Sequence, residues 1–545
     1  MKPSSTYYKS VINDAVAAGL NVIRLWVDIA GLPMTSPCRV DPDSDPNDQP
    51  FEYDGTNPQS DGLGSWHLDV RNVDYFNRLK EVIQYATSPP NNMFVEVTLF
   101  APQEGQLQLG PWSHAHAFRS DSSTALTGFS DTAQFVNKDS AQYLAMKPYV
   151  FNVVHWTVDA LSSFPTVYYE VANEPEYVQP SAAPACPGWA AKSTTDPATV
   201  AAWQNEIAVE LKSYIASKGV TQQVAVEPLT TTAAAPFRSA SLPPPDDAFT
   251  GVGQDSANAS IINSHYANLS PKPGTGGNLG HGLGAIHLAR EWYSQQKILG
   301  FNETKIVADG CGGKPNFIQS VDEGRAEAWE FMVDQGGIYN QFGYRCGAVS
   351  CPAAPAAPSN ARYCETRRQM GVLRSFLAST AVRIGTNMKT SLTNCSATIH
   401  SPCWINIESY PILPIPPNTV FKFWAAVEPT AAAGTKRWLL YIHHSKDRGL
   451  AFDGYRAEII TQPGAQYQEG GPAHPLSVCL GTTPGDYQVR WINPATAWKN
   501  GAVNANPVQA IHWAGSASCT PGGQNAVTLA ASPKYAYDIA LLISP

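Results

Sequence analysis

The chain of 545 residues is longer than a single hydrophobic core usually spans, so two domains are the first expectation. Charged residues make up only 15% of it, and the net charge of −9 argues against a nucleic-acid partner. No apolar run approaches the roughly 20 residues that cross a bilayer. A hydrophobic content of 43% with 14 tryptophans excludes disorder. We therefore expect a globular, mildly acidic protein with no membrane span.

The cysteines and the glycosylation sequons favour an extracytoplasmic protein. The chain has ten cysteines, and none forms a CxxC pair matched by a second pair of zinc ligands, so we expect disulfides and no metal site. Sequons for N-glycosylation begin at Asn258, Asn268, Asn302 and Asn394. No apolar segment follows Met1–Ser5, so no signal peptide is expected in that stretch. These features predict a secreted or extracytoplasmic protein with disulfide bonds.

Residues 1–385 alternate helical and strand patterns, as in a parallel α/β sheet or barrel. Helices are expected at residues 7–18, 73–86, 139–163, 196–219, 286–298, 325–334 and 360–379. Short buried strands are expected at residues 21–27, 93–100, 166–172, 223–226, 259–263, 305–308 and 337–339. The predicted fold is α/β, a (β/α)8 TIM barrel. Its first strand is missing or atypical, because only six residues precede the first helix.

The pattern changes at residue 433. From there, short strand-like runs are separated by Pro-Gly turns, and no helical periodicity is present. In the run at residues 486–493, Tyr487, Val489 and Trp491 alternate with polar residues and so share one face. We predict an all-β sandwich over residues 433–545, joined to the barrel by a Pro-rich connector at residues 386–432.

The most informative motif ends the third of these strands. The strand 166–172 leads directly into Asn173-Glu174-Pro175. Barrel enzymes keep their sites at the carboxyl ends of the strands, so Glu174 is placed where chemistry occurs. A carboxyl group there can protonate a leaving oxygen, and the amide of Asn173 can bind a sugar hydroxyl beside it. An ordinary surface carboxylate is the competing interpretation.

These residues make the chain similar to the clan A glycoside hydrolases, in particular the cellulase-like family 5 group, over roughly residues 10–380. The resemblance implies that Glu174 is the acid/base ending strand four, with Asn173 before it. It implies that Arg24 supports the site from strand two, and that His265 and Tyr266 close strand six. In this group, a glutamate nucleophile ends strand seven. No cofactor is implied, because two carboxyl groups and water suffice.

The predicted strand seven departs from that pattern. It reads Lys305-Ile306-Val307-Ala308 and is followed by Asp309-Gly310, with aspartate in place of glutamate. Asp309 could act as nucleophile, could serve as base to a water molecule, or could belong to a plain turn. The family's strand-eight tryptophan is absent too, which leaves only Tyr339 or Phe342 as a sugar platform.

Other residues are weaker candidates for substrate binding. Trp26 and Trp112 could stack on sugar faces, although aromatic residues more often pack in a core. Arg24 could be a structural ion-pair partner, and His265 and Tyr266 could be satisfied core residues. The His114-Ala115-His116 triplet has no placed third ligand, which favours a polar loop over a metal site.

The function predicted from the sequence is cleavage of O-glycosidic bonds in a β-linked polysaccharide by a two-carboxylate mechanism, in a protein expected to be monomeric. Glu174 is the acid/base in this prediction, and Asp309 is the nucleophile or base. The alternative is a catalytically impaired carbohydrate-binding or cell-surface adhesion protein on the same fold. In the adhesion version residues 430–545 bind the target without the barrel. Substrate, stereochemical outcome and endo or exo action stay open.

Overall fold

The computed structural model describes the central parts of both predicted regions. The described residues are 5–27, 34–36, 39–40, 45–56, 62–102, 110–113, 115–173, 175, 197–227, 257–265, 297–303, 321–333, 336–340, 362–379, 389–390, 420–428, 435–445, 476–478, 480, 484–495, 498–499, 502–503, 508–515, 527–529 and 538–545. Among them no helix is both long and apolar enough to span a membrane.

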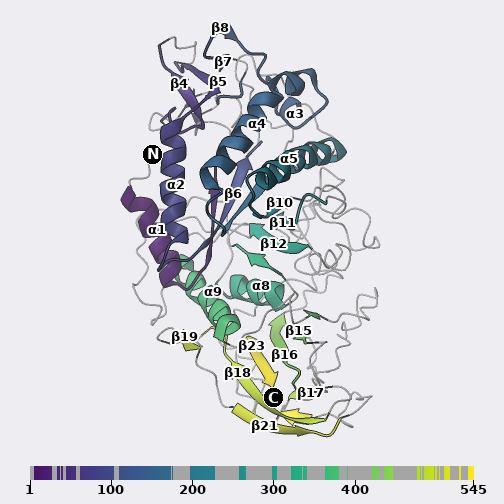
Figure 1. The fold of residues 1–545 in the computed structure, drawn as a ribbon. Coiled ribbons are helices and arrows are strands. Elements are labelled where there is room, and N and C mark those ends of the chain that lie inside the picture. The colour runs from purple at the N-terminus through teal and green to yellow at the C-terminus, as the bar shows by residue number, and fades with distance from the viewer. Residues whose placement is uncertain are drawn as a thin grey trace.

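The first region is built on a seven-stranded sheet whose strands all run parallel and follow one another in chain order (Figure 1). Its strands are β1 (Val22–Trp26), β6 (Phe94–Phe100), β9 (Val167–Ala172), β10 (Val224–Val226), β11 (Ile261–His265), β12 (Ile298–Glu303) and β13 (Ile338–Tyr339). β1 and β13 are its edges, and no eighth strand joins them within the described residues. The predicted parallel α/β sheet is therefore confirmed, and its strands do not close a complete ring.

Helices alternate with these strands. They are α1 (Ser5–Ala17), α2 (Val73–Thr87), α3 (Thr132–Phe135), α4 (Ala141–Leu161), α5 (Pro197–Ser217), α8 (Val321–Val333) and α9 (Arg362–Ser379). The sequence predicted each of them except the short α3. In α2, the side chain of Asn72 accepts a hydrogen bond from the backbone N–H of Tyr75 at the N-terminus. Phe76, Leu79 and Ile83 form its buried face at helical spacing.

The strand predicted at residues 305–308 has to be corrected, because an earlier segment takes its place in the sheet. The sixth strand of the sheet is β12, Ile298–Glu303, which pairs with β11 on one side and β13 on the other. Residues 304–320 lie outside the described part, and so does most of the helix predicted at 286–298. The carboxyl end of this strand therefore carries Glu303, six residues before Asp309.

The helical layer brings the ends of the first region together. Gly371 of α9 lies so close to α1 that an added Cβ would be 1.9 Å from the carbonyl oxygen of Ala18. Arg374 of the same helix donates a hydrogen bond to the carbonyl oxygen of Gly19, 3.0 Å away. Contact between the first and the last helix indicates a curled, barrel-like sheet, although its strands do not complete the circle.

Two small sheets lie outside this scaffold, and the sequence did not predict them. One has four strands in the order β4 (Phe51–Asp54), β5 (Ser65–Arg71), β7 (Ala117–Arg119) and β8 (Ser122–Ala125). The other pairs β2 (Met34–Ser36) with β3 (Arg39–Val40).

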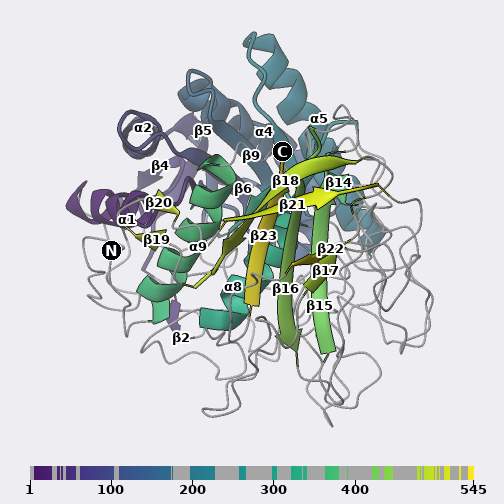
Figure 2. The ribbon, with the colours of Figure 1, turned by 90° about the horizontal axis from the view of Figure 1, so that it is seen from below.

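The C-terminal region is dominated by a six-stranded sheet beside α8 and α9 (Figure 2). Its order is β14 (Lys389–Thr390), β15 (Val420–Val427), β16 (Trp438–Ser445), β23 (Asp538–Ser544), β18 (Gly485–Ile492) and β21 (Val508–Trp513). The described residues add two pairs, β17 (Leu476–Val478) with β22 (Val527–Leu529), and β19 (Trp498–Lys499) with β20 (Ala502–Val503). β14 and β15 lie in the segment predicted as a connector, so this sheet begins before residue 433.

The C-terminal sheet and the barrel helices share one core. Trp329 of α8 stacks on Tyr441 of β16, with ring centroids 5.5 Å apart, and Phe376 of α9 packs against the same indole. Under them, Arg325 of α8 forms a bidentate ion pair with Asp538 of β23. The two regions are therefore joined by buried apolar and charged contacts.

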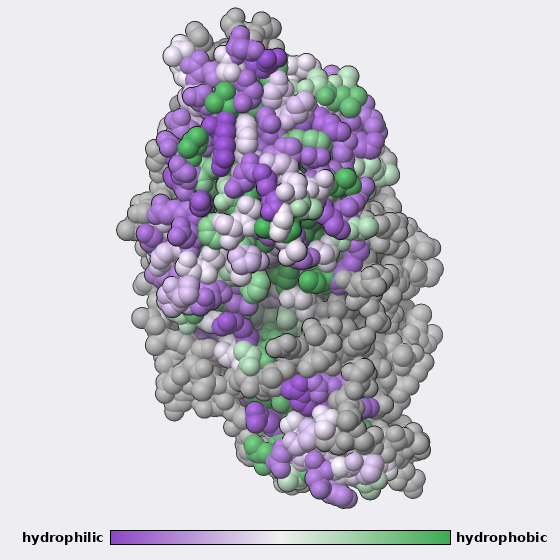
Figure 3. Space-filling view, in the orientation of Figure 1, coloured by the Kyte–Doolittle hydropathy of each residue, from purple (hydrophilic) through white to green (hydrophobic). Residues whose placement is uncertain are grey.

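The surface shows scattered hydrophobic residues. On the face shown in Figure 3, hydrophobic residues stand singly among hydrophilic ones over the described part of the barrel. The exposed large hydrophobic side chains come from separate elements, for example Val73 of α2, Leu144 of α4 and Val508 of β21. Single exposed apolar residues of this kind are normal and do not indicate a docking surface.

Candidate active site

Polar side chains line up on neighbouring strands of the seven-stranded sheet. Strand register puts Arg24, Glu96 and Tyr168 side by side on β1, β6 and β9. Thr98 and Glu170 pair two residues further along the same strands. Since side chains alternate across a strand, these residues share one face. Tyr168 also packs in a small apolar cluster with Ala225, Ile261 and Ile338.

Arg24 connects these polar residues to Asn173, the residue that directly follows β9. Its side chain is only 7% exposed, and it forms an ion pair with the fully buried Glu170. The Nη2 of Arg24 also donates to the Oδ1 of Asn173 at 2.8 Å, while its Nε donates to Thr98 at 2.9 Å. Asn173 is itself buried, and its backbone N–H donates to the carbonyl oxygen of Phe100. The residue before Glu174 is thus held from both its backbone and its side chain.

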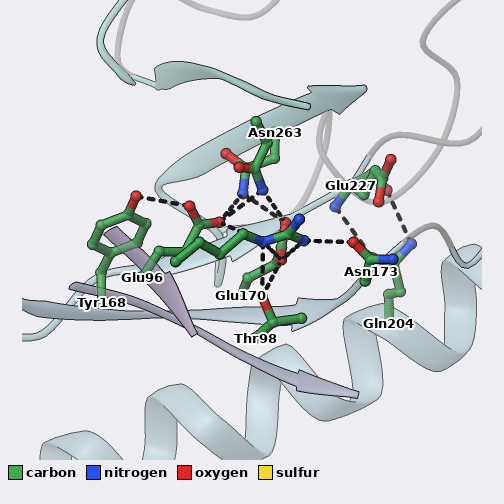
Figure 4. Close-up of polar contacts among 10 residues, drawn as sticks. Glu96, Thr98, Tyr168, Glu170, Asn173, Gln204, Glu227 and Asn263 are labelled. Carbon is green, nitrogen blue, oxygen red and sulfur yellow. Dashed lines mark hydrogen bonds and ion pairs between the residues drawn. The ribbon is translucent and has the colours of Figure 1, made fainter. Parts of the chain in front are cut away.

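Two amides bridge the two buried glutamates (Figure 4). The Nδ2 of Asn263 donates to Glu96 at 2.7 Å and to Glu170 at 2.8 Å. The Nδ2 of Asn302 donates to the same two oxygens, at 2.8 Å and 2.7 Å. The second oxygen of Glu96 accepts from the hydroxyl of Tyr168 at 3.0 Å. The four side chains form a closed polar cluster in the interior of the sheet.

Burial controls the protonation of Glu96. Removal from water and the nearby Glu170 raise the pKa of Glu96 from 4.5 to about 7, while the positive charge of Arg24 opposes the rise. Two carboxylates cannot both stay ionised at low cost in a buried site with a single guanidinium. Glu96 therefore holds a proton at a pH where an exposed glutamate has lost it.

Gly300 leaves the space that this cluster needs. It is the register partner of Asn263, and a Cβ added there would lie 2.0 Å from the Oδ1 of Asn263. We expect Gly300→Ala to displace the amide and to destabilise the protein by about 1–3 kcal/mol, as overpacking of a core does. Urea unfolding followed by tryptophan fluorescence measures this loss. An unchanged midpoint would show that the space is not required.

Both predicted catalytic residues lie outside the described part of the chain, and His265 is a predicted binding residue that lies within it. Glu174, Tyr266 and Asp309 lie outside the described residues. His265 is the last residue of β11, and Glu303 is the last residue of β12 and its register partner. The register shifts at this point, so Asn302 is the extra residue of a bulge, a feature often found beside active sites.

The predicted aromatic platforms divide into exposed and buried groups. Trp26 is partly exposed at the end of β1, with the guanidinium of Arg24 5.5 Å from its ring centre. Tyr339, at the end of β13, is partly exposed and packs edge-on against Phe301. Trp112 is fully buried against a cluster of phenylalanines, so neither face of its ring is available to a sugar. The prediction that Trp112 binds substrate is therefore corrected, because phenylalanines of β4, β6 and α3 pack around the ring.

Two further polar residues are buried in the structure. Asn302, the first residue of a sequon, is buried with its amide committed to both glutamates, so it cannot carry a glycan in the folded protein. Glu227, which follows β10, is buried, and its backbone exchanges two hydrogen bonds with the side chain of Gln204. Cys364 of α9 is disulfide-bonded, whereas the other nine cysteines lie outside the described residues, so the pairing of the cysteines stays a prediction.

Sequence reasoning missed the buried polar cluster. Glu96 and Glu170 lie within strands that the sequence predicts as buried, and the sequence analysis gives Asn263 and Asn302 no role in the site. The signal that was available is an alternation of polar and apolar residues with a period of two. Glu96 and Thr98 alternate with valines, and Glu170 follows Tyr168 by two, so a polar face runs along strands that are otherwise apolar. A charged residue inside a buried strand needs a partner, and that need points to a cluster.

Comparison with known proteins does not assign this chain to a family. No protein-family model matches the chain, and no curated protein matches it in sequence. Among solved structures, a beta-1,4-D-mannanase from Cryptopygus antarcticus is 15% identical, over 67% of this chain and 82% of that one, with a TM-score of 0.37. An endo-1,4-beta-mannanase from Rhizomucor miehei is also 15% identical, over 63% and 83%, with a TM-score of 0.38. Endo-glycoceramidase II from Rhodococcus sp. is 11% identical, over 96% and 97%, with a TM-score of 0.33. Similarity at this level does not establish a shared activity.

Proposed function

We propose that the protein is a glycoside hydrolase that cleaves β-linked polysaccharide outside the cytoplasm, with Glu174 as the acid/base. The observation that carries the proposal is the way Asn173 is held. Arg24, itself paired with Glu170, fixes the residue directly before Glu174 at the carboxyl end of β9. A general acid must be held within hydrogen-bond reach of the leaving oxygen, which requires this kind of support.

We propose Glu303 as the second carboxylate. In the family that the sequence resembles, the two carboxyl groups end strands four and seven, three strands apart. β12 is three strands from β9 and ends at Glu303. This assignment also restores the expected glutamate, whereas Asp309 follows six residues later. Asp309 stays the competing candidate for the same role.

The test is release of reducing sugar from β-glucans, mannans and xylans by the wild type and three variants. We expect Glu174→Gln and Glu303→Gln each to lower kcat by at least about 10³-fold, and Asp309→Asn to retain most of the activity. Glu81→Gln, which makes the same change on an exposed helix, is the matched control. Loss of activity in Asp309→Asn but not in Glu303→Gln would move the role to Asp309.

A second measurement separates the two carboxylate roles. An activated aryl glycoside has a leaving group that departs without protonation, so the Glu174→Ala variant can still cleave it. If the enzyme forms a covalent intermediate, added azide should then give a glycosyl azide of retained configuration. The nucleophile variant should instead give the azide of inverted configuration. If a folded wild type releases no sugar from any substrate, the proposal fails and the carbohydrate-binding alternative is favoured.

A further inference from the structure

The hydrogen bonds of the buried glutamates join strands that are not neighbours in the sheet. Glu96 is on β6 and Glu170 on β9, whereas Asn263 is on β11 and Asn302 on β12, with β10 between the two pairs. A flat sheet would hold such residues more than one strand spacing apart, about 5 Å per strand. The amides reach the carboxylates only because the sheet curls and its inner faces meet.

We propose that Glu96, Glu170, Asn263 and Asn302 form a cross-barrel clasp that holds the strand ends carrying the candidate catalytic residues at their working distance. This inference rests on the proposed function, and it makes the two glutamates positioning residues rather than catalytic ones. The described strands do not close a ring. Hydrogen bonds across the interior therefore provide part of the constraint that strand pairing provides in a complete barrel.

The clasp is connected directly to both strand ends. On one side, Glu170 holds Arg24, and Arg24 holds Asn173, the neighbour of Glu174. On the other side, Asn302 is the neighbour of Glu303 and is the extra residue of the β12 bulge. A shift of either glutamate therefore moves the backbone beside a candidate catalytic carboxylate. A displacement of ~1 Å there can cost about 10²-fold in rate.

One proton completes the clasp. The described charged and titratable groups facing Glu96 are Arg24 from β1 and Tyr168 and Glu170 from β9. Asn263 from β11 and Asn302 from β12 add amide donors. The Oε2 of Glu170 already accepts from the Nε and Nη2 of Arg24 and from the hydroxyl of Thr98, which leaves little room for a proton. The proton therefore resides on Glu96. Its loss would leave two negatively charged carboxylates that repel each other while they share the same amide donors.

The experiment compares wild type, Glu96→Gln and Glu96→Ala in unfolding and in catalysis, with Glu81→Gln as control. Because folding raises the pKa of Glu96 from 4.5 to about 7, the folded state binds the proton more tightly than the unfolded state. Its contribution to stability is complete below about pH 4.5 and is lost as the pH rises through about 7. Glutamine mimics the protonated acid, so Glu96→Gln should lack this decline while Glu81→Gln keeps it.

The kinetic constants distinguish a positioning role of Glu96 from a purely structural one. We expect kcat to fall about 10²-fold in Glu96→Ala at unchanged KM, and to recover in Glu96→Gln to within about threefold of the wild type. If Glu96→Ala does not fold, the glutamine variant still decides, because its stability profile must differ from that of the wild type. An identical pH dependence of stability in wild type and Glu96→Gln overturns the clasp. An inactive wild type with the expected stability profiles would refute the proposed function and leave the clasp standing.

Discussion

Replacement of Glu170 by glutamine is expected to destabilise the protein by about 3–5 kcal/mol, far more than the same change at Glu96. One oxygen of Glu170 receives three donors from Arg24 and Thr98, and the other receives the amides of Asn263 and Asn302. Glutamine has one oxygen acceptor and one NH2 group in place of the two carboxylate oxygens. Its NH2 group must therefore face either the donors of Arg24 and Thr98 or those of Asn263 and Asn302. The variant also removes the closer of the two ion-pair partners of the buried Arg24 guanidinium, the other being Glu96 at 3.8 Å.

The measurement is urea unfolding of Glu170→Gln, Glu96→Gln and Glu81→Gln, followed by tryptophan fluorescence near neutral pH. The three proteins carry the same chemical change in different surroundings, so the comparison isolates the effect of the site. We expect a large loss for Glu170→Gln and changes within about 1 kcal/mol for the other two. Equal losses at Glu170 and Glu96 would contradict the assignment of the proton to Glu96.

Removal of the charge of Asp538 is expected to cost a similar amount, about 3–5 kcal/mol, and to loosen the C-terminal sheet from the barrel. The Nε and Nη2 of Arg325 donate to the two carboxylate oxygens at 2.7 Å and 2.9 Å, and both side chains are almost fully buried. The hydroxyl of Tyr441 donates to the same carboxylate, and Gln369 accepts from Arg325. Asp538→Asn removes the negative charge that forms this bidentate ion pair with the buried guanidinium.

A double variant distinguishes the charge effect from general damage. Since buried ion pairs are often replaceable by apolar residues, Arg325→Met with Asp538→Leu should recover much of the stability lost in Asp538→Asn. The same interface bears on the adhesion alternative. A fragment of residues 430–545 would expose Leu439, Tyr441 and other core residues that now pack on α8 and α9. We expect that fragment to aggregate, and a soluble, folded fragment would contradict this view of the interface.

Much of the scaffold was predictable because hydrophobic period and strand length reveal burial. All but one of the seven parallel strands were located, in the correct order, and so were the long helices around them. The exception was β12. The apolar run Ile306-Val307-Ala308 has a stronger strand propensity than Ile298–Glu303, which contains Gly300 and follows a helical pattern. The glycine that weakened the prediction is required by the fold, because Asn263 occupies the space beside it.

The candidate site was predictable only where a motif marks it. Arg24 and Asn173 were proposed as supporting residues, and the structure joins them by a hydrogen bond. The glutamate clasp was not foreseeable in the same way, because its contacts depend on the curl of the sheet across β10. Local patterns carry no information about which residues meet across a barrel interior. The start of the C-terminal sheet was also missed, because the strand β15 directly follows a Pro-rich segment that was interpreted as part of a connector.

The burial of Asn302 has a consequence for production of the protein. N-glycosylation enzymes act on the extended chain as it enters the secretory pathway, where the sequon Asn302-Glu303-Thr304 is as accessible as any other. A glycan attached there would be too large for the interior that the folded chain gives to this side chain. Modification and folding therefore compete for one asparagine. A bacterial host, or replacement of Thr304 by alanine, removes that competition and should raise the yield of folded protein in a glycosylating host.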